Sequence, residues 1–210
     1  MQDSKIRLRQ ELVNSISHGL GIVFGLVCIP ILLTEAVNGN NPAGIVGAAI
    51  YSFSFLMVFT SSTLYHGFRN EKIRRVFKIL DHISIYFLIS GTYTPFLLIY
   101  MPNRLGVTLL VILWGLTLVG TVFKTFFTGR WDILSTILYL AMGWIMVVAG
   151  RSFFGNMPAS VIALIMTGAG LYTLGVIFYI WEKYTYSHAV WHVFVLAAAI
   201  CHYVAVFLSV

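Results

Sequence analysis

Two histidines near the end of the sequence, His188 and His192, are four residues apart. On an α-helix this spacing places both side chains on one face, with Cβ atoms about 5–6 Å apart. Two imidazoles at that separation can bind one metal ion, as they do in the H-E-x-x-H motif. The pair alone is a weak signal, because packed histidines also occur at this spacing. A metal site therefore needs further ligands elsewhere in the chain.

Three other polar residues supply such groups. Ser62 and His66 stand at the end of one apolar segment, and Asp81 stands near the start of the next. With His66 as a third ligand, three histidines and an open fourth position describe a catalytic type of zinc site rather than a closed structural one. Asp81 could hold a metal-bound water and act as general base. Ser62 is one turn before His66 and could bind a substrate carbonyl or orient a ligand.

The composition predicts that these residues belong to a membrane protein. Of the 210 residues, 59% are hydrophobic and 10% are charged, whereas soluble domains carry about 25% charged residues. The mean hydropathy is +0.90. Without the alternating pattern of a membrane β-barrel, helices are expected, because they satisfy their backbone hydrogen bonds internally. We predict an all-α integral membrane bundle. The chain has a net charge of +6, and we expect its basic residues to contact membrane lipids and not nucleic acid.

Seven stretches are long and apolar enough to cross a bilayer, which takes roughly 20 residues. They are residues 16–37, 43–67, 79–100, 105–123, 133–150, 160–180 and 187–208. We expect one seven-helix transmembrane domain over residues 1–210, with residues 1–15 as a cytoplasmic N-terminal segment and no signal peptide. Glycines should let these helices pack closely, namely Gly19, Gly21, Gly25, Gly44, Gly47, Gly168, Gly170 and Gly175.

The basic residues predict an orientation. Among the 13 lysines and arginines, only Arg104 and Arg151 fall on one side of the predicted spans. The other side holds Lys5, Arg7, Arg9, Arg69, Lys72, Arg74, Arg75, Lys78, Lys124, Arg130 and Lys183. Basic residues concentrate in cytoplasmic segments, so the N-terminus is expected inside and the C-terminus outside. Residues 69–78 are expected to form a basic cytoplasmic loop that also attracts anionic lipid.

This topology places the polar groups at one depth, near the predicted cytoplasmic face. Each group also has a simpler interpretation: a carboxylate at a helix N-terminus for Asp81, a headgroup contact for His66, and a bond to its own helix for Ser62. Ionisable groups inside spans are nevertheless functional candidates, because their insertion is costly. The shared depth of His66, Asp81, His188 and His192 favours a common metal site.

Three further polar residues, Glu11, Asn14 and His18, are spaced to share a helix face near the start of the first span. They are candidates for an outer shell around the metal or for a substrate gate, and the alternative is a capped start of the helix. His202 lies ten residues after His192, about 15 Å along a helix. It is therefore too far away to join the same metal, and it either lines an interior cavity or packs between helices. The sequence assigns no role to His82.

At these residues the sequence resembles the hemolysin III family, the bacterial branch of the progestin and adipoQ receptor superfamily. The resemblance covers essentially the whole chain. Glu11-x-x-Asn14-x-x-x-His18-Gly19 looks like the N-terminal motif of that branch. Three further signature motifs of the superfamily are matched by Ser62-x-x-x-His66, by Asp81 and by His188-x-x-x-His192.

The resemblance implies seven helices with the N-terminus inside, and zinc held by His66, His188 and His192 with Asp81 acting through a water. Adiponectin receptors of the superfamily have been linked to hydrolysis of ceramide-type amides, and the superfamily is grouped with membrane-bound alkaline ceramidases. Bacterial members carry a hemolytic name and have also been linked to control of membrane fluidity.

Four functions remain open from the sequence. The first is a zinc hydrolase that cleaves an amide or ester of a lipid entering from the inner leaflet. The second is a sensor or regulator of membrane lipids with a structural zinc ion. The third is a pore-forming cytolysin, which the lack of a long amphipathic inserting segment disfavours. The fourth is a transporter with a proton relay, which the clustering of the polar groups at one face disfavours.

Overall fold

The computed structural model describes residues 2–181 and 184–210, and these residues form helices and no strands. The helices are α1 (Gln2–Asn38), α2 (Pro42–Gly67), α3 (Glu71–Tyr100), α4 (Arg104–Phe127), α5 (Asp132–Gly143), α6 (Ile145–Ala149), α7 (Arg151–Phe154), α8 (Ala159–Ile180) and α9 (Ser187–Phe207). Within the described ranges, seven spans are long and apolar enough to cross a membrane, the fifth of them made of α5 and α6 together. The predicted all-α class and the number of spans are confirmed.

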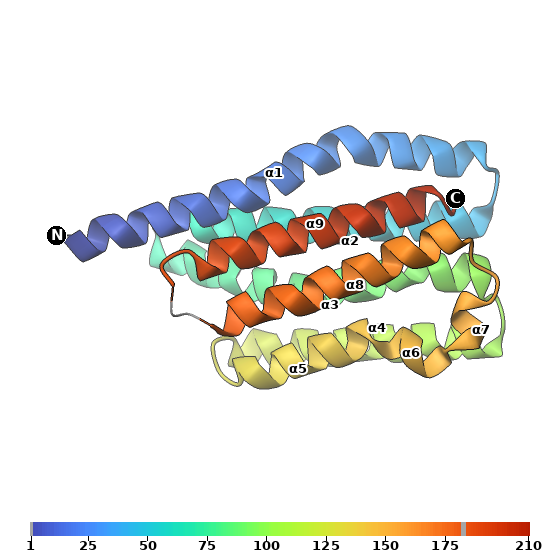
Figure 1. Ribbon diagram of the computed structural model, residues 1–210. Helices are drawn as coiled ribbons and strands as arrows, with labels where there is room; N and C mark the ends of the chain where they lie inside the picture. Colours follow the sequence, from blue (N-terminus) through green and yellow to red (C-terminus); the bar gives the residue numbers. More distant parts are fainter. Residues whose placement is uncertain (1, 182–183) are drawn as a thin grey trace.

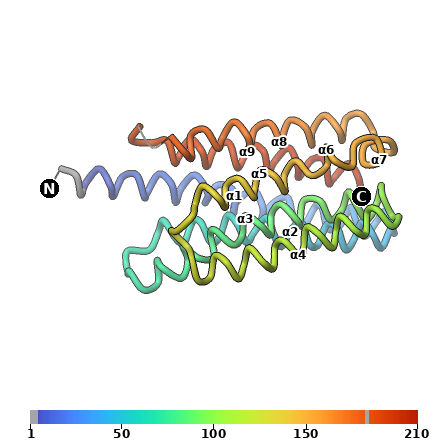
Figure 2. Tube along the Cα trace, turned by 90° about the horizontal axis from the view of Figure 1, so that it is seen from below, coloured from blue at the N-terminus to red at the C-terminus, as the bar shows by residue number. Residues whose placement is uncertain are grey.

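The long helices lie side by side along one direction, so that successive connections alternate between the two ends of the bundle (Figures 1 and 2). Helix α1 packs on α2 and α9, α3 packs on α2 and α4, and α8 packs on α9. Helix α9 also contacts α2 and α3. The second, third and seventh spans are therefore neighbours, as a site built from all three requires.

The start of α1 lies at the same end as the α2–α3, α4–α5 and α8–α9 connections (Figure 1). This end carries the larger set of basic residues, and the other end carries Arg104 and Arg151. Lys183, which the sequence assigned to the larger set, lies outside the described residues. The basic residues are therefore divided between the two ends of the bundle as the sequence predicted. Which side of the membrane each end faces stays a prediction.

Two helices begin earlier than the apolar stretches suggested. Helix α1 starts at Gln2 and not near residue 16. The expectation of a basic loop over residues 69–78 was wrong, because α3 is helical from Glu71 onward. The side chain of Asn70 accepts hydrogen bonds from the backbone amides of Lys72 and Ile73, which caps the helix and lets it start among charged residues. The basic side chains of this segment therefore project from a rigid helix.

The fifth span is interrupted where the sequence suggested one helix. Helix α5 ends at Gly143, and α6 follows Trp144. The Gly143 carbonyl accepts a hydrogen bond of 2.5 Å from the Tyr93 hydroxyl of α3, and the Trp144 indole donates to Thr173 of α8 at 3.0 Å. The Tyr93 hydroxyl thus satisfies a backbone carbonyl that is freed at the break, as backbone groups inside a membrane require. The Trp144 bond fixes its side chain against α8.

Glycines permit several of the close helix contacts, as expected. A Cβ atom at Gly47 of α2 would lie 2.5 Å from the Cα of Pro95 in α3, and one at Gly21 of α1 would collide with the ring of Phe59. The expectation was wrong for Gly170, where nothing lies within 4 Å of an added Cβ among the described residues. Packing at Gly47 holds α2 against α3, and these two helices carry His66 and Asp81.

We predict that Gly47→Ala lowers the free energy of unfolding by about 1–3 kcal/mol, the usual cost of overpacking. The obstructing atom at this position belongs to the backbone, so a rotamer change cannot relieve the contact. Gly115→Ala in α4 is the matched control, because nothing described lies within 4 Å of its Cβ, and it should be neutral or slightly stabilising. Thermal unfolding in detergent measures both variants, and equal melting temperatures would contradict this packing.

Candidate metal centre

Three histidines from two helices meet at the end of the bundle where α1 begins. His66 belongs to the last turn of α2, and His188 and His192 belong to the first turns of α9. One ring nitrogen of each lies within 4.8 Å of the other two. The His188 and His192 ring centroids are 4.6 Å apart, and that of His66 is 5.2 Å and 5.1 Å from them. A group of this kind could hold a metal ion.

Hydrogen bonds to one ring nitrogen define the tautomers of two of these histidines. The Nδ1 of His66 donates to Glu11 Oε2 at 2.6 Å, and the Nδ1 of His192 donates to the Asn14 carbonyl at 3.1 Å. In a neutral imidazole the other nitrogen, Nε2, then carries a lone pair. Metal-binding histidines typically have this arrangement, in which one nitrogen is anchored and the other is free to coordinate.

Buried ring nitrogens without protein partners support the fit to a metal. The Nε2 atoms of His66 and His188 are both inaccessible and have no hydrogen-bond partner within residues 2–181 and 184–210. A buried nitrogen of this kind costs free energy unless something binds it. Neutral imidazole is a good ligand for zinc, copper, iron and nickel. The three histidines therefore fit a divalent transition metal, and their geometry does not select among these ions.

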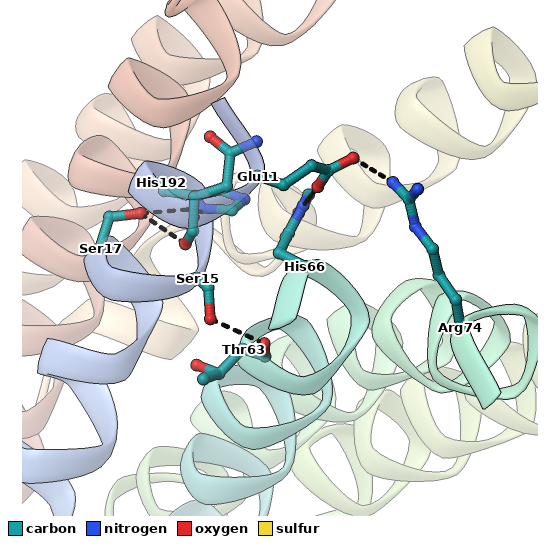
Figure 3. Close-up of polar contacts among 8 residues, drawn as sticks. Glu11, Ser15, Ser17, Thr63, His66, Arg74 and His192 are labelled. Atoms are coloured by element: carbon teal, nitrogen blue, oxygen red, sulfur yellow. Dashed lines mark hydrogen bonds and ion pairs between the residues drawn. The ribbon is translucent and has the colours of Figure 1, made fainter. Parts of the chain in front are cut away.

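Helix α1 supplies the anchoring groups on one side of the cluster (Figure 3). Glu11 lies between His66 and Arg74 of α3 and forms an ion pair with the arginine. Ser17 lies 3.0 Å from the Nδ1 of His192 and itself donates to the Asn14 carbonyl. One carboxylate thus connects α1, α2 and α3 beside the histidines.

His18 also packs directly on the cluster. Its ring stacks on His192 with centroids 3.6 Å apart and meets Phe59 edge-on at 5.0 Å. It is buried, and neither nitrogen has a hydrogen-bond partner in the described part of the chain. The face predicted for Glu11, Asn14 and His18 therefore does point toward the histidines, with each residue making a different contact.

Asp81 and Ser62 line the same cavity as the three histidines, and this cavity has a volume of about 470 Å³. The Ser62 hydroxyl is buried beside the Asp81 carboxylate, which also interacts electrostatically with His66. No carboxylate of the described residues joins the group of mutually close ligand atoms. Asp81 thus lines the same cavity as the three histidines but lies outside the group of potential ligand atoms.

The two remaining histidines, His82 and His202, do not belong to the three-histidine cluster. The Nδ1 of His82 donates to the Lys78 carbonyl at 2.8 Å on its own helix, and its ring lies on the cavity wall with Asp132. His202 lines a different, apolar cavity. This arrangement agrees with the expectation that His202 is too far away to join the three-histidine cluster.

The sequence interpretation missed two charged residues of this region. Arg74 was counted only as a topology signal, although Arg74, Lys78 and Asp81 share a helix face by their i, i+4, i+7 spacing. Lys124 was counted in the same way, yet it is fully buried in the last turn of α4 and pairs with Asp132 at 2.8 Å. A buried lysine needs such a partner, because its charge is otherwise too costly.

The fold and the site together define a seven-span membrane protein with a buried three-histidine centre at one end. A family model described as haemolysin-III related matches residues 6–203. The chain is 42% identical over 192 residues to the "Hemolysin-3 homolog" of Bacillus subtilis (strain 168), covering 91% of this chain and 90% of that protein. It is 39% identical over 192 residues to the "Hemolysin-3" of Bacillus cereus, covering 91% and 88%.

A more distant similarity extends to animals. The human "Monocyte to macrophage differentiation factor" is 27% identical over 167 residues, which is 77% of this chain and 69% of that protein. The match of the family model and the two Bacillus relatives establish the family. The chain belongs to the haemolysin-III related family and is a multi-pass protein of the bacterial plasma membrane.

We predict that the purified protein retains a divalent metal and that His66→Ala, His188→Ala and His192→Ala each lose most of it, because each removes one of three ligands. His82→Ala is the control, since its ring bonds to its own helix and not to the cluster. Elemental mass spectrometry of the proteins in detergent measures the metal content. Equal metal in wild type and in all three ligand variants would contradict the site.

Glu11→Gln should lower metal affinity about 10- to 100-fold while the protein stays folded, the usual effect of removing a group that orients a ligand. The neutral amide loses the ion pair with Arg74 and the strong bond to His66. Glu35→Gln changes the same side chain at an exposed position of α1 and should leave affinity unchanged. Titration with a competing chelator compares the variants, and equal affinities would mean that Glu11 does not orient His66.

Proposed function

We propose that the three histidines hold zinc and that the protein hydrolyses an amide or ester bond of a membrane lipid. The observation that carries this proposal is the cavity in which the histidine cluster, a carboxylate and a hydroxyl face one space. Three neutral imidazoles with room for another ligand are typical of catalytic zinc centres. Zinc in such a site supplies Lewis acidity and makes water a nucleophile near neutral pH.

Two residues of the chain have suitable positions for the chemistry. An Asp81 carboxylate oxygen would accept a proton from the attacking water and later pass it to the leaving nitrogen or oxygen. The Ser62 hydroxyl, which is buried beside Asp81, would donate a hydrogen bond to the carbonyl oxygen as charge develops there. The products are a fatty acid and the amine or alcohol from the other half of the lipid.

A neighbouring apolar cavity favours a lipid as the substrate. It shares six wall residues with the histidine cavity, namely Val58, Ile85, Thr136, Tyr179, Trp191 and Val195. A polar reaction centre that adjoins an apolar space suits a molecule with a polar linkage and a hydrocarbon chain. The acyl chain would lie in the apolar space, and the linkage to be cleaved would lie near Asp81.

We further propose that the centre faces the cytoplasm, so that a lipid of the inner leaflet reaches it. The larger set of basic residues lies at this end of the bundle, and basic residues favour the cytoplasmic side. The basic first turns of α3 would also attract anionic headgroups to the same end.

Asp81→Asn should lower lipid hydrolysis about 10²- to 10⁴-fold, the range for loss of a general base, while zinc content stays near that of the wild type. Glu71→Gln, an exposed acid-to-amide change on the same helix, should keep full activity. Fatty acid release from vesicles that contain ceramide and phospholipids measures turnover, and elemental analysis measures zinc. Wild-type zinc without turnover of any lipid would contradict the hydrolase and favour a regulator with structural zinc.

A second candidate function follows from the names of the Bacillus relatives, which describe hemolysins. A pore-forming activity would release a dye trapped in the same vesicles without releasing fatty acid. Recording both signals in one sample separates the two functions, because hydrolysis should depend on Asp81 and leakage through a pore should not.

A further inference from the structure

A second cavity, of about 120 Å³, lies beside the histidine cavity and is lined almost entirely by apolar and aromatic side chains. They come from α2, α3, α5, α6, α7, α8 and α9, together with Trp144 between α5 and α6. An engineered apolar cavity of about 150 Å³ in another protein binds benzene, so this somewhat smaller space has room for a short part of a hydrocarbon chain. Most of its wall offers no hydrogen bonds.

Two polar atoms of this wall stand out. The hydroxyl of Tyr172 and the Nδ1 of His202 are buried, and neither has a hydrogen-bond partner within the described ranges. The two rings face the cavity from α8 and α9 with centroids 5.6 Å apart. Buried polar atoms are almost always paired in folded proteins, so two unpaired ones on one apolar cavity indicate a ligand with a polar group.

The orientation of His202 is fixed by its other nitrogen. Its Nε2 donates to the Ile165 carbonyl at 3.2 Å, so in the neutral ring Nδ1 is an acceptor that points away from this bond. Gly168 lies against the imidazole, where a Cβ atom would collide with it. The glycine on α8 therefore leaves room for the imidazole ring. His202 is 7% exposed.

These atoms define the hydrogen bonds that an occupant must make. Nδ1 of His202 needs a donor, and the Tyr172 hydroxyl can donate in return. An alcohol satisfies both with a single oxygen, whereas a ketone, an ester or a hydrocarbon has no proton to give to Nδ1. The apolar wall requires that the rest of the occupant be hydrocarbon.

We propose that this cavity binds the hydroxyl end of a lipid-like alcohol, a hydrocarbon chain or ring that carries one hydroxyl group. His202 lies ten residues beyond His192, about 15 Å along α9, so the bound hydroxyl is out of reach of the histidine centre. The proposal therefore does not rest on hydrolysis. Because this is the cavity proposed above for the acyl chain of a substrate, the alcohol and that chain would occupy it in turn and not together.

The test compares dodecanol that carries a photoreactive diazirine with its methyl ether, which keeps the oxygen but cannot donate. Each probe is irradiated with the full-length protein in detergent, and peptide mass spectrometry locates and quantifies the labelled residues. Three proteins are compared: wild type, Tyr172→Phe and Tyr203→Phe. Tyr203 is the matched control, because its hydroxyl already donates to the Cys28 carbonyl at 2.7 Å.

The alcohol should label cavity residues of the wild type and of Tyr203→Phe about two- to tenfold more than the ether does, the effect of one hydrogen bond. Tyr172→Phe should reduce alcohol labelling toward the ether level without changing ether labelling. Gly168→Ala, which displaces the His202 ring, should reduce it as well. Equal labelling by alcohol and ether in the wild type, or full alcohol labelling of Tyr172→Phe, would overturn the proposal and leave water as the partner of these atoms.

Discussion

The arrangement of this protein depends on buried imidazole nitrogens that need a partner inside a membrane. His66 comes from one end of α2 and His188 and His192 come from the start of α9, so nothing local in the chain brings them together. In low-dielectric surroundings an unpaired nitrogen is costly. A metal ion bound by the three imidazoles would satisfy the unpaired Nε2 atoms of His66 and His188. It would also join two helices that are far apart in the sequence. Binding of metal and stability of this end of the bundle are therefore expected to be linked.

Helix α1 gives this centre its rigidity. The Glu11 side chain accepts a hydrogen bond from His66 and the Asn14 backbone carbonyl accepts one from His192. Arg74 of α3 holds the carboxylate in place. Groups that orient metal ligands in this way affect metal affinity nearly as strongly as the ligands do. The early start of α1 and the capped start of α3 are thus part of the site, because each supplies a charged residue from beyond the purely apolar span.

Much of this could be predicted from the sequence because the governing signals are local or periodic. Apolar length determines the spans, the four-residue spacing of His188 and His192 determines their common face, and alternation of the chain across the membrane puts His66 and Asp81 at the same end. The resemblance of the motifs to a known family indicated zinc and the roles of these residues. No sequence signal assigned a partner to Lys124. The start of α3 had a signal in Asn70, a preferred N-cap residue, but the charged residues after it favoured a loop.

What escaped prediction depends on tertiary contacts. The pairing of Glu11 with Arg74 depends on which face α1 turns toward α3, and a single sequence does not specify this orientation. The break at Trp144 is accompanied by two contacts from other helices, the bond from Tyr93 to the Gly143 carbonyl and the bond from the Trp144 indole to Thr173. The unpaired atoms of Tyr172 and His202 become visible only when α8 and α9 are packed together, since neither residue type is unusual within a span.

The most direct test of the metal centre is X-ray absorption at the zinc edge on the purified protein in detergent. We expect a zinc ion with imidazole nitrogen neighbours at about 2.0–2.1 Å, the usual zinc–nitrogen distance, and loss of the imidazole signal in the His188→Ala/His192→Ala double variant. A spectrum of wild-type protein that lacks imidazole scattering, or one that the double variant leaves unchanged, would contradict the claim that these histidines hold the metal.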